Sequence, residues 1–253
     1  MTWATFHEER ISRGRPVVVA HRGVPKELAE NTLSSFALAI EQGADVLETD
    51  LRFTADGEIV LFHDETVERT TDGAGPVSGF TLPEFKRLRT RRPSDNLPTD
   101  EPPPTLVDLL TMTQAQVPLL LELKDPTFAS PARAEQLIRI LHAYDMLEKS
   151  AIVSFKSELI AAIKAVYPQM PAGYITLNDP VPPRGVELMG PFWPLLFINP
   201  FYVRNAHKKG GIVAPLDTNP LPRLSIYLRM GVDALLADEP GQVLRALEAR
   251  TNS

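Results

Sequence analysis

The chain has 253 residues, a length that suits one α/β barrel, one domain with an insertion, or two small domains. Apolar residues make up 43% and aromatic residues 7%, which is enough for a buried core and excludes a disordered chain. The formal charge of -6, from 26 basic and 32 acidic residues, excludes a broad cationic surface for nucleic acid or anionic lipid, and the lack of cysteine excludes disulfides, thiolate metal sites and a cysteine nucleophile.

The amino-terminal sequence does not predict export or membrane anchoring. The segment MTWATFHEERISRGRP contains acidic residues and lacks the apolar run of about 7 to 15 residues found in secretory signals. Nowhere does the sequence hold about 18 consecutive apolar residues. We therefore expect a soluble cytoplasmic protein without stable membrane insertion. Its expected partner is a small molecule rather than nucleic acid, and the sequence leaves its oligomeric state open.

Short apolar runs alternate with amphipathic segments along the whole chain. The runs predicted as strands are VVVA from Val17, VLETDL from Val46, PLLLELK from Pro118, AIVSF from Ala151, AGYIT from Ala172, LLFIN from Leu195, IVAPL from Ile212 and DALLAD from Asp233. The segments with helical periodicity are 32–42, 105–114, 131–146, 157–167, 201–209, 221–230 and 241–250. This alternation indicates a parallel sheet, and eight strands favour a closed (β/α)8 TIM barrel over an open sheet.

Two stretches of this map call for comment. The helix predicted over 32–42 follows Asn31, a residue type common at N-caps, and ends at Gly43. The stretch from Asn178 to Pro194 contains five prolines, and we expect no regular structure there.

One connection is far longer than a barrel loop. Residues 54–104 separate the second strand from the next helix, whereas βα loops usually have about 2 to 6 residues. The segment opens with TADGEIVLFHD, in which Asp56 and Gly57 predict a tight hairpin. We predict one catalytic domain over 1–253 with a subdomain inserted at 54–104. Because βα loops lie on the carboxyl-terminal face of a barrel, this subdomain should overhang the face that carries active sites.

Three carboxylates are predicted to meet in the barrel mouth. Side chains alternate along a strand, so Glu48 and Asp50 share one face of VLETDL, while Glu122 and Lys124 share one face of PLLLELK. The leucines on the opposite faces should pack on helices. Clustered carboxylates repel unless a cation lies among them, and oxygen donors favour Mg2+ or Ca2+. The sequence predicts one such ion, with salt bridges to Lys124 and Arg52 as the alternative.

Two histidines lie at strand ends. His21 ends the first strand, and His63 ends the strand EIVLFH just before Asp64. A lone histidine is more often structural, but two imidazoles beside a metal suit a pair that abstracts one proton and donates another. Arg22 and Lys124 add positive charge at the same rim, as a phosphate site requires. A carboxylate substrate would also satisfy them, so a metal-dependent aldolase or isomerase stays open at this point.

The string VVVAHRGVPKELAENTLSSFALAIEQGADVLETDLRFTADGEIVLFHDETVERTTDG resembles the amino-terminal pattern of the glycerophosphodiester phosphodiesterase family. That pattern runs HRG, ENT, E-x-D, DG, and HD followed by R-T-T-D/N-G. The resemblance continues through PPPTLVDLL, LLELK, AIVSF, HKKGGIVAPLDTN and RMGVDALLADEP but not through 178–194. It therefore spans nearly the whole chain.

The resemblance implies a barrel that uses a divalent metal, Mg2+ or Ca2+, to hydrolyse a glycerophosphodiester to glycerol 3-phosphate and an alcohol. The residues that it assigns are Glu48, Asp50 and Glu122 as metal ligands, His21 and His63 as general acid and base, and Arg22 and Lys124 as phosphate-binding residues. Glu30 in the ENT string matches an acid that recurs near the family's site, with a structural role at the start of a helix as the alternative.

The chain departs from the family on the seventh strand. Where relatives often carry an aromatic W-T-V-N string, this sequence reads Leu216, Asp217, Thr218, Asn219, which leaves the headgroup open. Asp217 suits a polyol, a cationic alcohol or a helix cap. The candidate apolar walls of the pocket, each with core packing as the alternative, are Phe155, Phe80 and Phe85.

Other functions remain as alternatives. A lyase of the sphingomyelinase D type resembles the same barrel and releases a cyclic product, and a lysophospholipase D-like enzyme would take an acylated diester. A non-catalytic, metal-stabilised barrel predicts that some of the charged residues are missing. All seven are present, which favours an enzyme.

Overall fold

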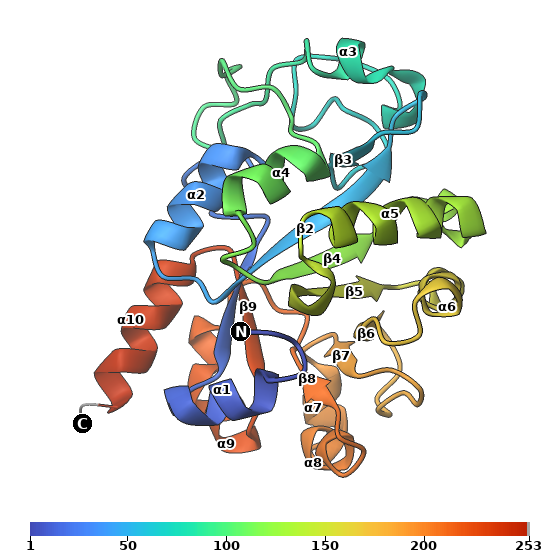
Figure 1. Ribbon diagram of the computed structural model, residues 1–253. Helices are drawn as coiled ribbons and strands as arrows, with labels where there is room; N and C mark the ends of the chain where they lie inside the picture. Colours follow the sequence, from blue (N-terminus) through green and yellow to red (C-terminus); the bar gives the residue numbers. More distant parts are fainter. Residues whose placement is uncertain (252–253) are drawn as a thin grey trace.

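The computed structural model describes residues 1–251 and is a (β/α)8 TIM barrel, as the sequence predicts (Figure 1). Its parallel strands are β1 (Val17–His21), β2 (Val46–Phe53), β4 (Leu119–Leu123), β5 (Ser150–Ser154), β6 (Ala172–Thr176), β7 (Leu188–Pro191), β8 (Ile212–Val213) and β9 (Ala234–Ala237). They are ordered β8-β7-β6-β5-β4-β2-β1-β9. Backbone hydrogen bonds from Asp233 to Val213, 2.9 Å, and from Asp238 to Thr218, 2.8 Å, join the β9 and β8 ends.

Helices surround this sheet. They are α1 (Phe6–Arg13), α2 (Leu33–Glu41), α4 (Leu106–Thr113), α5 (Pro131–Ala143), α6 (Ser157–Val166), α7 (Leu195–Ile198), α8 (Tyr202–His207), α9 (Leu224–Met230) and α10 (Pro240–Thr251). Within residues 1–251, none of the helices has both the length and the apolar character needed to cross a membrane.

The strands position the site through alternation and register. Leu47 and Leu51 of β2 join the apolar cluster beneath the outer helices, together with Leu119, Leu121 and Leu123 of β4. The other face of β2 points into the barrel, where Val46 packs with interior residues. In the β2–β4 register, Asp50 lies directly beside Glu122. Acidic side chains from two adjacent strands are therefore brought to the carboxyl-terminal mouth of the barrel.

The amino-terminal helix closes the opposite end. Phe6 of α1 is fully buried, and it packs in the barrel-interior cluster with Trp3, Val17 and Val46. The Trp3 indole N–H donates to the backbone oxygens of Leu119 (3.3 Å) and Lys149 (3.2 Å). The barrel interior is thus sealed below the site.

The prediction of the sixth strand is wrong. LLFIN was predicted as a strand, but Leu195–Ile198 is the helix α7, and the strand is β7, which lies within the proline-rich stretch expected to be irregular. A four-residue apolar run does not distinguish the two structures by periodicity. Pro191 is tolerated in β7 because it is the last residue of the strand and its carbonyl still accepts from Leu216, 2.8 Å.

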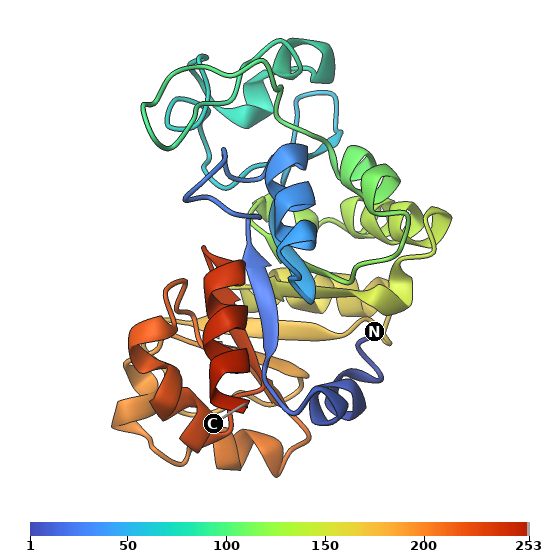
Figure 2. The same ribbon diagram turned by 90° about the vertical axis from the view of Figure 1, so that its left-hand side faces the viewer.

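Residues 54–104 lie between β2 and α4 and project from one end of the molecule, opposite α7 and α8 (Figures 1 and 2). The predicted hairpin is confirmed, since β3 (Ile59–Leu61) pairs antiparallel with β2 through a turn in which Gly57 has φ 88°. The segment also contains α3 (Leu82–Phe85). Phe85 and Phe80 pack in a small apolar cluster of the segment's own side chains, so neither is a wall of the barrel cavity.

Replacing Phe6 with alanine tests the closing role of α1. We expect Phe6→Ala to lower the free energy of unfolding by about 3 to 5 kcal/mol, because it empties a buried site. Ile11→Ala is the matched control on the same helix, where the side chain is 70% exposed, and it should change stability by less than about 0.5 kcal/mol. Urea denaturation measures both, and equal effects would contradict the packing described here.

Candidate active site

A sharp turn follows β1 and carries the HRG string. Arg22 (φ 55°) and Gly23 (φ 88°) both have left-handed backbone, and the Arg22 N–H donates to the main-chain oxygen and Oε2 of Glu48, each at 3.1 Å. A β-carbon on Gly23 would lie 2.7 Å from a backbone carbon of Ser35, so glycine alone lets this turn pack on α2. The turn thereby places His21 and Arg22 beside the acidic strand β2.

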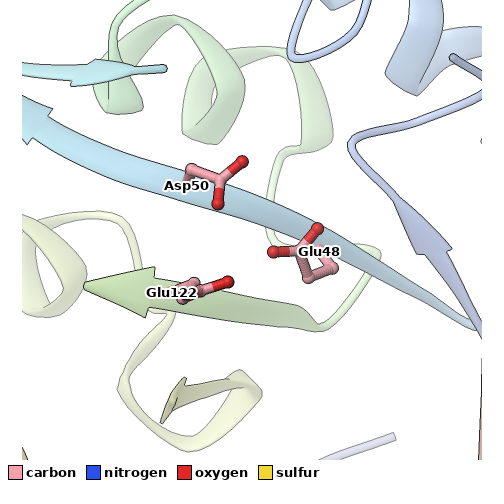
Figure 3. Close-up of side chains that lie close together, drawn as sticks. All are labelled: Glu48, Asp50 and Glu122. Atoms are coloured by element: carbon pink, nitrogen blue, oxygen red, sulfur yellow. The ribbon is translucent and has the colours of Figure 1, made fainter. Parts of the chain in front are cut away.

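Glu48, Asp50 and Glu122 form a buried carboxylate cluster, hereafter the acidic triad. One oxygen from each lies within 4.8 Å of the others. Their exposed fractions are 3%, 0% and 7%. Figure 3 shows the three carboxyl groups turned toward one another from β2 and β4. The sequence-based prediction that these acids share the barrel mouth is therefore confirmed in geometry.

The triad is electrostatically strained. Burial and the charge of Asp50 raise the pKa of Glu48 well above its ordinary range and the pKa of Glu122 to about 7. Burial acts in the same direction on Asp50, but Arg22 and Lys124 outweigh it and lower the pKa of this carboxyl. In the absence of a bound metal ion, Asp50 is the triad member whose negative charge is stabilised by neighbouring residues of the protein.

Two cations face the three carboxylates. Arg22 Nε lies 2.9 Å from Asp50, and Lys124 Nζ lies 2.6 Å from Glu122 Oε1 and 3.5 Å from Asp50 Oδ1. Arg52, which the sequence offered as a counter-charge, instead donates Nε to the backbone oxygen of His63, 2.9 Å. Salt bridging of the triad is thus present. Within residues 1–251, the buried Asp50 Oδ1 accepts no hydrogen bond.

Each candidate histidine is held by a carboxylate. His21 Nδ1 lies 2.7 Å from Asp238, and His63 Nδ1 lies 2.6 Å from Asp64, so in each ring Nε2 is the nitrogen available for proton transfer. Burial, together with the charges of Arg22 and Lys124, lowers the pKa of His63. His63 is therefore neutral near pH 7.

Three residues that the sequence did not single out for this role support the site, and the first of them is Asp238; the other two are Asn31 and Arg69. Asp238 ends the predicted strand DALLAD, and Thr218 also donates to it, 3.1 Å. Burial opposes its ionisation, but the hydrogen bond from His21 contributes to lowering its pKa. Position at a strand end, the signal that identified His21, was available for Asp238 as well.

Asn31 is not the N-cap of α2. The cap is Thr32, whose hydroxyl accepts from the N–H of Ser35, while Asn31 donates its amide to Asp50, 2.9 Å, and accepts from Thr49, 2.7 Å. A left-handed backbone at Asn31, φ 57°, turns its side chain inward rather than along the helix axis. The asparagine of the ENT string thus orients a triad member.

Glu30 and Arg69 connect the insertion to the mouth. Glu30 accepts from Arg22, 3.1 Å, and from both terminal nitrogens of Arg69, 2.8 and 2.7 Å, so its alternative role at a helix start is wrong. Arg69 also binds Asp64, the partner of His63. These ion pairs hold the insertion's histidine and the Arg22 turn in one network.

A cavity of about 290 Å³ is lined by both candidate histidines, both candidate phosphate-binding residues and two of the three triad acids; the third, Asp50, is fully buried and does not line it. One side is polar and carries His21, Arg22, Glu48, His63, Glu122 and Lys124. The other side is apolar and is formed by β5 to β9 and the loops that follow them, including Phe155, Ile175, Met189, Leu216 and Leu236. The cavity therefore offers one charged half and one apolar half to a ligand.

Asp217 does not line this cavity. It binds Arg223 through both carboxylate oxygens, 2.6 and 2.7 Å, and accepts from the Tyr227 hydroxyl, 2.5 Å. This buried cluster occupies the side chain fully, so neither a polyol nor a cationic alcohol contacts it. Leu216 and Thr218, on either side of it, are the residues that reach the cavity.

The model of the Glycerophosphoryl diester phosphodiesterase family matches residues 21–242. The chain belongs to this family. Its membership confirms the family and the enzyme class predicted from the sequence, a phosphoric diester hydrolase. A glycerophosphodiester phosphodiesterase of Caldanaerobacter subterraneus is 31% identical over 234 residues, which cover 89% of this chain and 95% of that relative.

Solved structures agree with this assignment. One from Galdieria sulphuraria has a TM-score of 0.82 and 28% identity, and the match covers 92% of this chain and 98% of that one. A phosphodiesterase of Oleispira antarctica, solved with its product sn-glycerol-3-phosphate, has a TM-score of 0.78 and 26% identity, with 92% and 97% covered.

The raised pKa of Glu122 predicts how the free energy of unfolding depends on pH when a chelator keeps the protein free of metal. The folded pKa of about 7 exceeds the ordinary 4.5, so the folded state binds the extra proton and its stability falls as pH rises between these values, by up to about 3 kcal/mol. Glu122→Gln should flatten this slope. Urea denaturation at pH 5 and pH 8 measures it, and identical slopes in the two proteins would contradict the electrostatics.

Proposed function

We propose that this protein is a metal-dependent phosphodiesterase that hydrolyses glycerophosphodiesters to glycerol 3-phosphate and an alcohol. The observation that carries the proposal is the convergence of the acidic triad, two cations and two carboxylate-held histidines on one cavity. Each of these groups can perform one function in phosphodiester cleavage: metal binding, phosphate binding or proton transfer.

Glu48, Asp50 and Glu122 are the proposed ligands of one divalent ion, Mg2+ or Ca2+. The fit rests on an all-oxygen donor set, on the buried Asp50 Oδ1, which accepts no hydrogen bond within residues 1–251, and on the crowding that raises the pKa of Glu48 and Glu122. When bound, such an ion supplies Lewis-acid stabilisation of the negative charge that develops on phosphate oxygens.

Arg22 and Lys124 are the proposed phosphate-binding residues. Both line the cavity beside the triad, and each already contacts a triad carboxylate. Arg22 offers two donor nitrogens in one plane, which matches two phosphate oxygens, while Lys124 offers a point charge beside Phe155, whose ring centroid lies 5.5 Å from Nζ. They orient the phosphate between the histidines.

The histidines divide the proton transfers. His63 is neutral near pH 7 because of its lowered pKa, so its Nε2 suits the base that removes a proton from the attacking hydroxyl. His21 donates a proton to the leaving alkoxide, and Asp238 stabilises the charged ring before that donation. The attacking group is water or a hydroxyl of the substrate's glycerol.

Several further predictions belong to this proposal. Residues 54–104, which carry His63, act as a subdomain of one catalytic domain over 1–253. The partner is a small diester, in keeping with the glycerol phosphate bound to the Oleispira antarctica relative. Binding of nucleic acid is not part of the function, and the location is cytoplasmic.

Diester turnover tests the proposal directly. The substrates are glycerophosphocholine, glycerophosphoethanolamine, glycerophosphoglycerol, lysophosphatidylcholine and bis-p-nitrophenyl phosphate, each with EDTA and with Mg2+ or Ca2+ restored. We expect glycerol 3-phosphate from the glycerophosphodiesters, its acylated form from lysophosphatidylcholine, and p-nitrophenol from bis-p-nitrophenyl phosphate, each released only with the metal. Turnover that is indifferent to EDTA, or a cyclic phosphate as the final product, would refute the proposal.

His63→Ala separates proton transfer from metal binding. We expect the turnover number to fall by a factor of about 1000 or more, because the base is lost, while metal affinity stays within about 3-fold of wild type. Glu48→Ala should instead abolish both, because it removes a ligand. Calorimetric titration with Mn2+ and a turnover assay measure the two quantities. Lost metal binding with retained activity in His63→Ala would refute its role.

Asp238→Asn tests the orientation of His21. We expect a 10- to 100-fold lower kcat with little change in KM, on the order seen when a supporting carboxylate is removed. Lys26→Met is the matched control, since it removes an exposed contact of Asp238 (Nζ to Oδ2, 3.8 Å) outside the cavity lining and should cost about 3-fold or less. Steady-state kinetics on glycerophosphocholine measures both. An unchanged kcat in Asp238→Asn would contradict the role of His21 as the acid.

A further inference from the structure

Most of the large apolar side chains that are exposed lie in one region of the chain. Eight of them are exposed within residues 1–251, and six of the eight lie between residues 177 and 201. We call these six the apolar rim: Leu177 (57% exposed), Val181 (58%), Phe192 (37%), Phe197 (45%), Ile198 (69%) and Phe201 (61%). Isolated exposed apolar side chains are ordinary, whereas a gathered set marks a surface that contacts another apolar phase.

The apolar rim lies on the carboxyl-terminal face of the barrel. Leu177 follows the last residue of β6, and Phe192 follows the last residue of β7. The Phe192 N–H donates to the oxygen of Thr176, 2.7 Å, which holds these two exits together. Asn199 donates its side-chain amide to the oxygen of Pro180, 2.8 Å, and ties the α7 segment to the β6–β7 loop.

The exposed rings of Phe192 and Phe197 are supported by the less exposed Trp193. Trp193 packs edge to face against Phe192 and Phe197, with ring centroids 6.1 and 5.8 Å away. The Arg223 guanidinium lies 4.3 Å from the Trp193 ring centroid, and Asp217 holds Arg223 through two oxygens. The buried Asp217 cluster thus supports the surface above it rather than binding substrate.

The apolar rim adjoins the active-site cavity. Phe192 forms a backbone bridge with Leu216, which lines the apolar half of the cavity. That half extends through Ile175 and Met189 toward the polar half. Residues 54–104 project from the end of the molecule opposite α7 and α8 (Figures 1 and 2). The apolar rim and the apolar half of the cavity are therefore neighbours on this face of the barrel.

We propose that the apolar rim docks on the surface of an uncharged lipid aggregate, a zwitterionic membrane or micelle, and that the apolar half of the cavity takes the acyl chain of a lysophospholipid presented there. The occupant follows from this adjacency, because an exposed apolar surface next to a cavity with an apolar half and a proposed phosphate site matches an acylated phosphodiester. Residues 177–201 contain only Asp179, Arg184 and Glu187 as charged residues, and the chain carries -6 overall, so attraction to anionic lipid is not the driving force.

The docking part of this proposal stands apart from catalysis, whereas the choice of substrate rests on the proposed function. Sedimentation with phosphatidylcholine vesicles tests docking alone, since that lipid has two acyl chains and is not the proposed substrate. The test variant combines Ile198→Ser and Phe201→Ser, two exposed positions outside the cavity lining. The matched control is Ile11→Ser on α1, which is 70% exposed at the closed end of the barrel.

We expect the wild type and Ile11→Ser to sediment with vesicles at low and high salt, and the double variant to bind at least 10-fold more weakly. Turnover of glycerophosphocholine should be equal in all three, while turnover of micellar lysophosphatidylcholine should fall at least 5-fold in the double variant alone. Absent wild-type sedimentation, equal binding by the double variant, binding that needs anionic lipid, or self-association lost in the double variant would overturn the docking proposal. Vesicle binding without turnover of any diester would refute the proposed function and leave docking standing.

Discussion

The crowding of three carboxylates in the barrel mouth is the constraint on which the rest of the site depends. Burial and mutual repulsion hold Glu48 and Glu122 near neutrality, and Arg22 and Lys124 offset the charge in part. Such a cluster is costly unless a further positive charge completes it. The left-handed turn at Arg22 and the amide of Asn31 are arranged around this need, since both act on the acidic strand β2.

Much of this arrangement follows from local sequence pattern. Alternation along VLETDL and PLLLELK was enough to place the acids inside and the leucines of the opposite face outside, because a strand has only two faces. Strand ends located His21, and the Asp56–Gly57 turn predicted the hairpin that carries His63. Each of these signals depends on residues that lie close together in the sequence, so it can be recognised in a single sequence without a structure.

What the sequence did not predict depends on contacts between distant segments. The pairing of His21 with Asp238 joins positions 217 residues apart, and the link from Arg69 to Glu30 spans 39. The confusion of α7 with a strand has a similar origin, because tertiary packing decides which short apolar run enters the sheet. Asn31 suited an N-cap by residue type, and only the structure shows its amide bound to Asp50.

The central claim is that one divalent ion and the substrate phosphate share the mouth between the acidic triad and the two histidines. A crystal structure of the protein with Ca2+ and glycerol 3-phosphate tests it most directly. The account predicts an anomalous peak coordinated by Glu48, Asp50 and Glu122, with the phosphate against Arg22 and Lys124. An ion bound elsewhere, or a phosphate held away from these residues, would contradict it.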